Sequence, residues 1–295
     1  MGGKLPTSSE SKFAARELVL GPAEDCTLGI ESAIGIGTTY LGTKLRLGEQ
    51  AIVDEFKTHG NEEDLSNLSY VLHGVAQEEE SLPPHVKAQI ASGSYHGGSL
   101  APGDYDYGHG GMTFDDFASH EHCKLAGLNR CHVLALRLYT TSSYPRFNGP
   151  LRRREKPHPF AMCVYYLFHG LKRLRSVAAQ LAPEKVTQEL DLWRGMQDMA
   201  INQDSFLRRG GTELAAMSTS GSRAVASAYA ASATPLIFRY KTRGLNRGCS
   251  IEFLSVYPKE REYLYPPLTY LQPEGGTHRR DDNGYLIVDI TPQIA

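Results

Sequence analysis

The sequence lacks any long apolar run and any excess of one charge. No segment approaches the roughly 18 uninterrupted apolar residues of a membrane span, and the first residues lack the apolar core of a secretory signal. We therefore expect a cytoplasmic protein with no membrane partner. Lysine and arginine total 31 against 33 acidic residues, and the net charge of -2 gives no reason to expect nucleic acid as a partner.

Disulfide and metal-site patterns are also missing. The 5 cysteines are odd in number and irregularly spaced, which is typical of reduced thiols and not of a disulfide framework. His120 and His122 carry zinc-capable nitrogens, but on a helix they would point apart, so we expect no metal site. Gly35 and Gly37 lack the third glycine of a dinucleotide fingerprint, and the sequence has no phosphate-binding loop motif and no nucleophile elbow.

What the sequence does contain is an ordinary globular composition. With 295 residues, 41% of them hydrophobic and 22% charged, the chain can bury a sizeable core. We divide it into an N-terminal extension, residues 1–110, and a C-terminal domain, residues 111–295. A glycine-rich passage over 93–111 predicts a surface loop near this boundary. The extension either caps the domain, regulates access to it or binds a target.

Two kinds of periodicity follow one another along the chain. Apolar residues at helical spacing predict helices near residues 45–58, 62–76, 84–91, 114–126 and 159–181. The apolar run Val133-Leu134-Ala135-Leu136 suggests a further buried element over 131–140. Short alternating runs bounded by turns predict strands at 189–194, 213–219, 235–241, 250–256, 262–265, 268–271 and 284–290. Helices first and strands later indicate an α+β fold, with a mixed β core of two packed sheets and a cleft between them.

Two glutamates stand two residues apart near the start of a predicted strand. In extended backbone Glu260 and Glu262 would point to the same side. Paired carboxylates repel one another and seldom help folding, so the pair suggests chemistry. The alternative is a solvated charged turn.

Two upstream motifs favour the chemical interpretation. Arg194 ends an alternating run and is followed by Gly195, and an arginine side chain can bind phosphate in a planar, bidentate manner. The run Ser218-Thr219-Ser220 lies where a strand leads into a helix, so small hydroxyl residues let a ligand approach the backbone. Arginine, then Ser-Thr-Ser, then Glu-x-Glu resembles the R-S-E signature of mono-ADP-ribosyltransferases, and the Glu-x-Glu form is similar to the arginine-specific branch of that family.

The resemblance implies an NAD-dependent transferase that needs no metal and acts on a protein with an exposed arginine. Residues 111–295 would be the catalytic domain. Glu262 would hydrogen-bond the nicotinamide ribose and stabilise its developing positive charge. Glu260 would orient and deprotonate the acceptor guanidinium, and Tyr257 would contact the acceptor. Tyr229 would stack on the nicotinamide.

The same resemblance implies the rest of the NAD site. Arg194 would hold the NAD phosphate or ribose, and the Gly195 backbone would bind the nicotinamide amide. Ser218 would support Glu262 from the neighbouring strand. Thr219 and Ser220 serve either the ligand or the turn alone.

The sequence departs from the family pattern in two places. Ala216 stands where an aromatic residue is common, and an arginine expected soon after Tyr229 is missing. Arg208, Arg209 or Arg223 would then have to supply phosphate contacts. Two other functions stay open: an NAD glycohydrolase, in which water replaces the guanidinium, and a catalytically inactive module that binds NAD or a protein partner.

Overall fold

The computed structural model describes residues 16–18, 20–36, 48–92, 95, 106–181, 183–201 and 205–294. The glycine-rich loop predicted over residues 93–111 falls mostly outside these residues. Among the described residues no helix is long and apolar enough to cross a membrane.

Helices dominate the first part of the chain, as predicted. Three of them begin with a capping box, in which Asn61, Thr113 and Asn129 each accept a hydrogen bond from a backbone N–H of the first turn. The helices before the main sheet are α1 (Ile30–Ile34), α3 (Glu49–His59), α4 (Glu62–His73), α5 (Pro84–Ser92), α6 (Phe114–Ala118), α7 (Glu121–Leu125), α8 (Arg130–Thr140), α9 (Tyr144–Arg153), α10 (Ala161–Leu181) and α11 (Pro183–Val186).

Strands occupy the second part, with two short helices among them. They are β2 (Leu190–Met196), β4 (Gly211–Glu213), β5 (Met217–Ser220), β6 (Leu236–Thr242), β7 (Cys249–Ser250), β8 (Glu262–Tyr265), β9 (Thr269–Arg280) and β10 (Leu286–Gln293). The helices α12 (Phe206–Arg209) and α13 (Arg223–Ala230) interrupt them. Near the N-terminus β1 (Arg16–Glu17) pairs in parallel with β3 (Met199–Ala200).

The main sheet is mixed and runs in the order β4-β9-β10-β6-β2-β5-β8-β7. The pair β10 and β6 is parallel, and the other neighbours are antiparallel. Strands β2 and β5 are joined only at Trp193 and Ser220. The two predicted sheets are therefore the two halves of one hydrogen-bonded sheet, in which β2 and β5 almost separate. The α+β class is confirmed.

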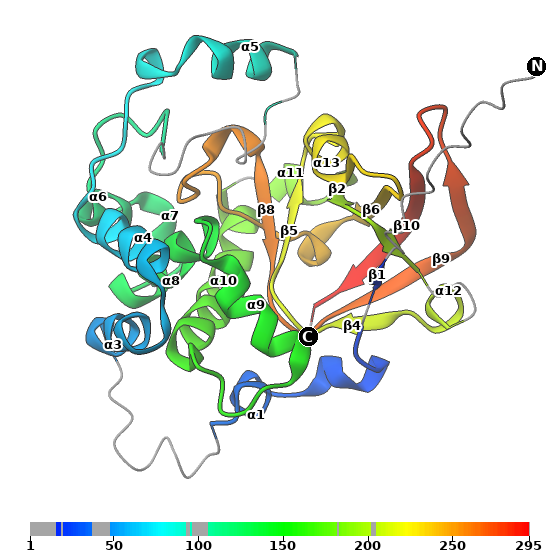
Figure 1. Cartoon of the computed structure of the whole chain (residues 1–295), viewed down its shortest axis with the longest axis horizontal. Coiled ribbons are helices and arrows are strands. Elements are labelled where there is room, and N and C mark those ends of the chain that lie inside the picture. The colour runs from blue at the N-terminus through cyan, green and yellow to red at the C-terminus, as the bar shows by residue number, and fades with distance from the viewer. Residues whose placement is uncertain are drawn as a thin grey trace, which may run out of the picture.

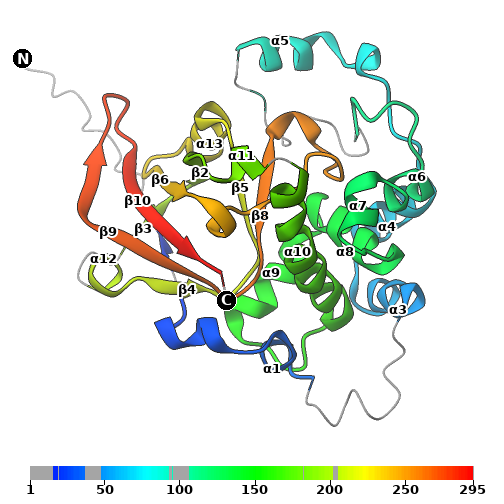
Figure 2. The ribbon, with the colours of Figure 1, turned by 180° about the vertical axis from the view of Figure 1, so that it is seen from behind.

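The helices lie beside the sheet, and β5 and β8 lie on the side of the sheet that faces them (Figure 1). The view from behind shows the same arrangement, with α10 next to β8 (Figure 2). A large apolar core joins the helices to the strands, since Phe56, Phe147 and Leu171 belong to the same buried cluster as Ala216 and Leu264. A second core covers the other half of the sheet, around Leu192, Phe238, Tyr240, Tyr265 and Val288.

The first core includes helices from both sides of residue 110, and the division at that position stays a prediction. Helix α10 confirms the predicted apolar stripe, because Val164, Leu171, Leu174 and Val177 are buried, and Phe168 between the first two is half-buried.

Three local predictions were wrong. The strand predicted at 213–219 is divided into β4 and β5, because residues 214–216 are not extended. The segment predicted as one helix over 114–126 is divided into α6 and α7, because Ser119 and His120 leave the helical path. Of the strand predicted at 250–256 only Ser250 lies in a strand, at the end of β7, because the chain then turns back and Leu254 N–H donates to Ile251 O. The apolar residues of that turn are buried in a loop, and periodicity alone does not separate such a run from a strand.

Gly195→Ala should destabilise the fold. A Cβ at position 195 would lie 1.8 Å from the carbonyl oxygen of Ala226, so α13 would be forced away from β2. We expect the free energy of unfolding, measured by urea denaturation, to fall by about 2 kcal/mol or more.

Gly275→Ala on β9 is the matched control. A Cβ there meets nothing within 4 Å, so this variant should stay within about 0.5 kcal/mol of wild type. Equal stability of the two variants would contradict the close packing of α13 on β2.

Candidate active site

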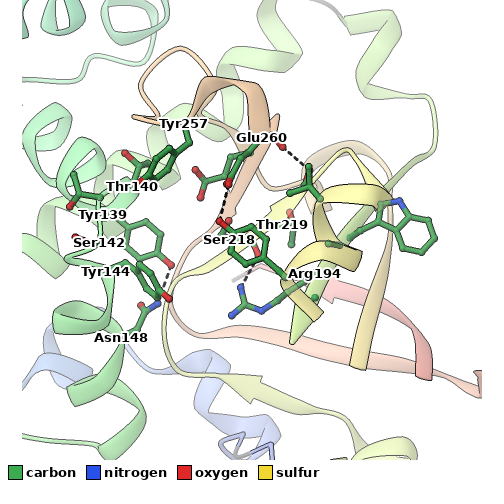
Figure 3. A pocket seen from close by; sticks show the side chains of 18 of the residues that line it. Tyr139, Thr140, Ser142, Tyr144, Asn148, Arg194, Ser218, Thr219, Tyr257 and Glu260 are labelled. Carbon is green, nitrogen blue, oxygen red and sulfur yellow. Dashed lines mark hydrogen bonds between the residues drawn. The ribbon is translucent and has the colours of Figure 1, made fainter. Parts of the chain in front are cut away.

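A cavity of about 450 Å³ opens between the helices and the sheet, at the place where β2 and β5 separate. Its walls come from the end of α8, the start of α9, β2, β5, α13 and the segment that leads into β8. Figure 3 shows the helical side chains facing those of the strands across this space. The lining residues are Glu63, Tyr139, Thr140, Thr141, Ser142, Tyr144, Asn148, Trp193, Arg194, Gly195, Ser218, Thr219, Ser220, Val225, Ala226, Tyr229, Tyr257, Glu260 and Glu262.

Side chains take the place of the missing strand pairing at the bottom of the cleft. The guanidinium of Arg194 donates from Nη1 to the carbonyl oxygen of Ser218 at 2.7 Å. Two residues earlier on the chain, the carbonyl of Ala216 accepts from the hydroxyl of Tyr139 at 2.9 Å and from Nδ2 of Asn148 at 3.1 Å. The cleft therefore stays open without leaving these backbone carbonyls unsatisfied.

Glu262 lies at the start of β8 and is 6% exposed. Ser220 stands opposite it in the ladder, and Ser218 is its diagonal neighbour on the same face. The Ser255 hydroxyl donates to Oε2 of Glu262 at 3.1 Å, and the Ser218 side chain is also hydrogen-bonded to this carboxylate. Burial raises the pKa of Glu262, while the two hydroxyl groups and the charge of Arg194 act in the opposite direction.

Glu260 reaches the same cavity, but not by strand alternation as predicted. It ends a short 3-10 helix, η5 (Pro258–Glu260), and the following Arg261 has the left-handed backbone conformation, with φ 51°. The two glutamates are thus separated by a tight turn and not by extended backbone. The hydroxyl of Tyr229 on α13 donates to Oε1 of Glu260 at 2.8 Å.

The other predicted site residues also lie around the cavity. The Thr219 hydroxyl donates to the carbonyl of Tyr263 at 2.8 Å, and the Ser220 hydroxyl donates to the carbonyl of Glu260 at 2.6 Å. Both hydroxyls therefore stabilise the sheet and the turn. Tyr257 precedes η5, and its side chain points into the pocket beside Glu260 (Figure 3). Gly195 lies under α13, where no side chain fits.

Positive charge in the cavity is limited. Among the described lining residues Arg194 is the only lysine or arginine. Arg223 instead forms an ion pair with Asp281 and lies over the ring of Trp193, 5.6 Å from its centroid. Arg208 and Arg209, on α12, are not among the lining residues. Trp193 is half-buried, and the guanidinium groups of Arg223 and Arg239 cover its ring.

Sequence reasoning missed the helical wall of the cavity. Tyr139 and Asn148 are buried there, whereas Tyr144 is 50% exposed at the rim. The Ser142 hydroxyl donates to the Glu63 carboxylate of α4 at 2.5 Å, so the extension also contributes to the lining. The available signal was weak: Tyr139 lies on α8 and Tyr144 and Asn148 lie four residues apart on α9, a spacing that is equally typical of a core.

The residues with metal-ligand chemistry lie elsewhere. His120 and His122 pack their rings against Phe253, with centroids 4.6 and 4.7 Å away. Within the described part of the chain, no three side chains of histidine, cysteine, aspartate or glutamate are grouped so that they could hold a metal ion.

Comparison with known proteins identifies the family. The model of the family described as NAD:arginine ADP-ribosyltransferase matches residues 119–290, more than half of the chain, and the chain belongs to this family. A search of curated protein sequences finds no match. NAD is thus the co-substrate, and ADP-ribosyl transfer from NAD is the reaction of the family to which the chain belongs.

Solved structures with a similar fold have low sequence identity to this chain. A mutant of the eukaryotic mono-ADP-ribosyltransferase ART2.2 in complex with NADH is 16% identical, with a TM-score of 0.45, and the match covers 84% of this chain and 89% of that one. The ADP-ribosyltransferase HopU1 of Pseudomonas syringae pv. Tomato DC3000 is 15% identical, with a TM-score of 0.48 and coverage of 72% and 98%. The C3 exoenzyme of Clostridium limosum is 17% identical, with a TM-score of 0.44 and coverage of 62% and 95%.

Glu262→Gln should make the folded protein more stable at neutral and higher pH. Burial raises the pKa of Glu262, so between its ordinary and its raised pKa the folded state binds more protons than the unfolded state. The free energy of unfolding therefore falls as pH rises through this interval, and a neutral glutamine avoids that loss. We expect the variant to exceed wild type by about 1 kcal/mol near pH 8 and by less near pH 4, measured by urea denaturation.

Glu252→Gln is the control for this comparison. Glu252 is exposed on the loop that follows β7, so its substitution should leave the urea midpoint unchanged at both pH values. A Glu262→Gln protein that is less stable than wild type near pH 8 would contradict the prediction.

Proposed function

We propose that this protein transfers ADP-ribose from NAD to arginine side chains of proteins and releases nicotinamide. The observation that carries the proposal is that Glu260 and Glu262 line one cavity, opposite tyrosine side chains of the helical wall, with Arg194 at its base. This reaction brings together two positive charges, one on the sugar and one on the acceptor, and each of the two carboxylates acts on one of them.

Glu262 is the group proposed to act on the sugar. Breaking the bond between C1′ of the ribose and the nicotinamide nitrogen leaves the electron pair on nicotinamide and develops positive charge on the ribose. A buried, ionised carboxylate held by Ser218 and Ser255 stabilises that charge more strongly than it stabilises the ground state. By the family resemblance it also accepts a hydrogen bond from the ribose 2′-hydroxyl.

Glu260 is the group proposed to act on the acceptor. A guanidinium nitrogen attacks C1′ with its lone pair, and the proton that it loses goes to Glu260. Because the pKa of a free guanidinium is above about 12, the attack needs a nearby anion to withdraw this proton. The Tyr229 hydroxyl fixes the Glu260 carboxylate, and Tyr257 beside it contacts the acceptor.

The remaining lining residues are proposed to hold NAD. Arg194 contacts the phosphate or ribose, and the backbone of Gly195 binds the nicotinamide amide. Ser218 supports Glu262, while Thr219 and Ser220 shape the turn against which the cofactor lies. The Tyr229 ring, which is 40% exposed at the rim, is available to stack on nicotinamide.

Glu262→Ala should lower nicotinamide release by at least about 100-fold, since the developing positive charge loses its counter-charge. The measurement uses NAD labelled in its adenine half, with and without agmatine as an arginine analogue, and follows both nicotinamide release and label transfer. The exposed Glu252→Gln is the control and should keep wild-type rates. Full activity of Glu262→Ala would reject the assignment.

Glu260→Gln should separate transfer from hydrolysis. Without the carboxylate the guanidinium cannot lose its proton, so label transfer to agmatine should fall by at least about 100-fold while nicotinamide release stays within about tenfold. The same assay provides the measurement. Wild type that releases nicotinamide without labelling agmatine would make the protein a glycohydrolase, and a well-folded protein giving neither product would favour a binding module.

A further inference from the structure

The loop between β7 and η5 carries a buried hydroxyl that the family signature does not contain. Ser255 has 0% exposure, and its Oγ donates to Oε2 of Glu262 at 3.1 Å. The same oxygen accepts the backbone N–H of Tyr257 at 3.1 Å. One side chain therefore connects the carboxylate of β8 to the backbone that leads to Glu260.

The peptide groups on both sides of Ser255 are fixed from the helical half of the molecule. Arg137 on α8 donates from Nη1 to the carbonyl of Leu254 at 2.9 Å. The backbone N–H of Asp106 donates to the carbonyl of Val256 at 2.8 Å, and the N–H of Val256 donates to Oγ1 of Thr140 at 3.1 Å. With both neighbours held in this way, Ser255 has little freedom to move away from Glu262.

The two groups that hold this loop also hold each other. Asp106 and Arg137 are 0% and 2% exposed, and two nitrogens of the guanidinium donate to the two carboxylate oxygens, Nη1 to Oδ1 at 3.1 Å and Nη2 to Oδ2 at 2.5 Å. The Tyr70 hydroxyl donates to Oδ2 of Asp106 at 2.8 Å, and His109 Nδ1 lies 3.0 Å from Oδ1. Burial alone would raise the pKa of Asp106, but Arg137 and His109 hold it below its usual value, so the pair is ionised.

We propose that Ser255 is a positioning residue for the Glu262 carboxylate, and that the buried pair of Asp106 and Arg137 holds Ser255 in place. This proposal rests on the role of Glu262 proposed above. Tyr70 and Asp106 precede the part of the chain that the family model matches, residues 119–290. The N-terminal extension is therefore part of the apparatus that orients the active site, and not only a cover for it.

A readout specific to positioning comes from the titration of Glu262. The groups that face this carboxylate are Arg194 from β2, Ser218 from β5, Tyr139 from α8 and Ser255 from the loop, with Glu260 on its own segment. The Ser255 hydrogen bond favours the ionised form, so its removal raises the pKa of Glu262 further. A purely structural serine would not change this titration.

The first test compares Ser255→Ala with wild type in the full-length protein. We expect kcat for nicotinamide release to fall by about tenfold, with little change in the KM for NAD, because a hydrogen bond to a charged group is lost. We also expect the acid limb of the pH profile, and the titration of the Glu262 carboxyl carbon in a ¹³C NMR experiment, to move to higher pH. Ser250→Ala, at an exposed position of β7, is the control and should change neither.

The NMR titration separates the two proposals. If wild type does not cleave NAD, the proposed function fails. A Glu262 titration that still shifts in Ser255→Ala then supports the hydrogen bond by which Ser255 positions Glu262. If wild type is active and Ser255→Ala has the wild-type titration and the wild-type kcat, the positioning role of Ser255 is overturned and the proposed function stands.

The second test asks whether the extension acts through Ser255. Tyr70→Phe removes a hydrogen bond from Asp106 without leaving a buried charge unpaired, and Asp106→Asn removes the ion pair itself. We expect each to lower kcat and to shift the Glu262 titration in the same direction as Ser255→Ala, Asp106→Asn more strongly. When each is combined with Ser255→Ala, the effects of the two substitutions on kcat should be less than additive. Full additivity of Tyr70→Phe and Ser255→Ala would contradict the proposal that the extension acts through Ser255.

Discussion

The active-site cleft depends on one break in a hydrogen-bonded sheet. Strands β2 and β5 pair only at Trp193 and Ser220, and beyond that point they separate. Alternate residues of a strand direct their backbone groups to the same side, so the carbonyls of Ser218 and Ala216 face the gap. Buried carbonyls without partners would close the gap or destabilise it. Side chains of Arg194, Tyr139 and Asn148 donate to them instead, and these three side chains also line the cavity.

Neutral hydroxyl groups contact both carboxylates of the same cleft. Glu262 is held by serine hydroxyls and Glu260 by the hydroxyl of Tyr229, while the guanidinium of Arg194 donates to a backbone carbonyl. A lysine or arginine in direct contact with either glutamate would cancel the charge before a substrate arrived. In the proposed reaction, hydroxyl donors fix the geometry and leave the negative charge available for a positive sugar and a positive acceptor, which is the condition for preferential binding of the transition state.

The sequence predicted those parts of the site that are local. Arg194, Ser218 and Glu262 were placed on strands by short alternating runs, and β2, β5 and β8 confirm these strands. The turn at Arg261 was not predictable, because a left-handed non-glycine residue depends on its surroundings and leaves no pattern. Tyr139, Asn148 and the loop around Ser255 were missed for a related reason. Their contacts join segments distant in the chain, and the buried residues of that loop look like a strand.

The pair of Asp106 and Arg137 shows why an ion pair is present where an apolar pair would pack as well. A buried ion pair often contributes no more to stability than two apolar side chains of the same size, because desolvation offsets the attraction. Apolar replacements could not donate to the carbonyl of Leu254, however, and leaving that group buried and unsatisfied costs about 1–3 kcal/mol. The loop has left the sheet at β7, so no strand is available as a donor. The charged, directional contact of Arg137 thus holds this loop in one orientation, together with the groups of the loop that reach Glu262 and Glu260.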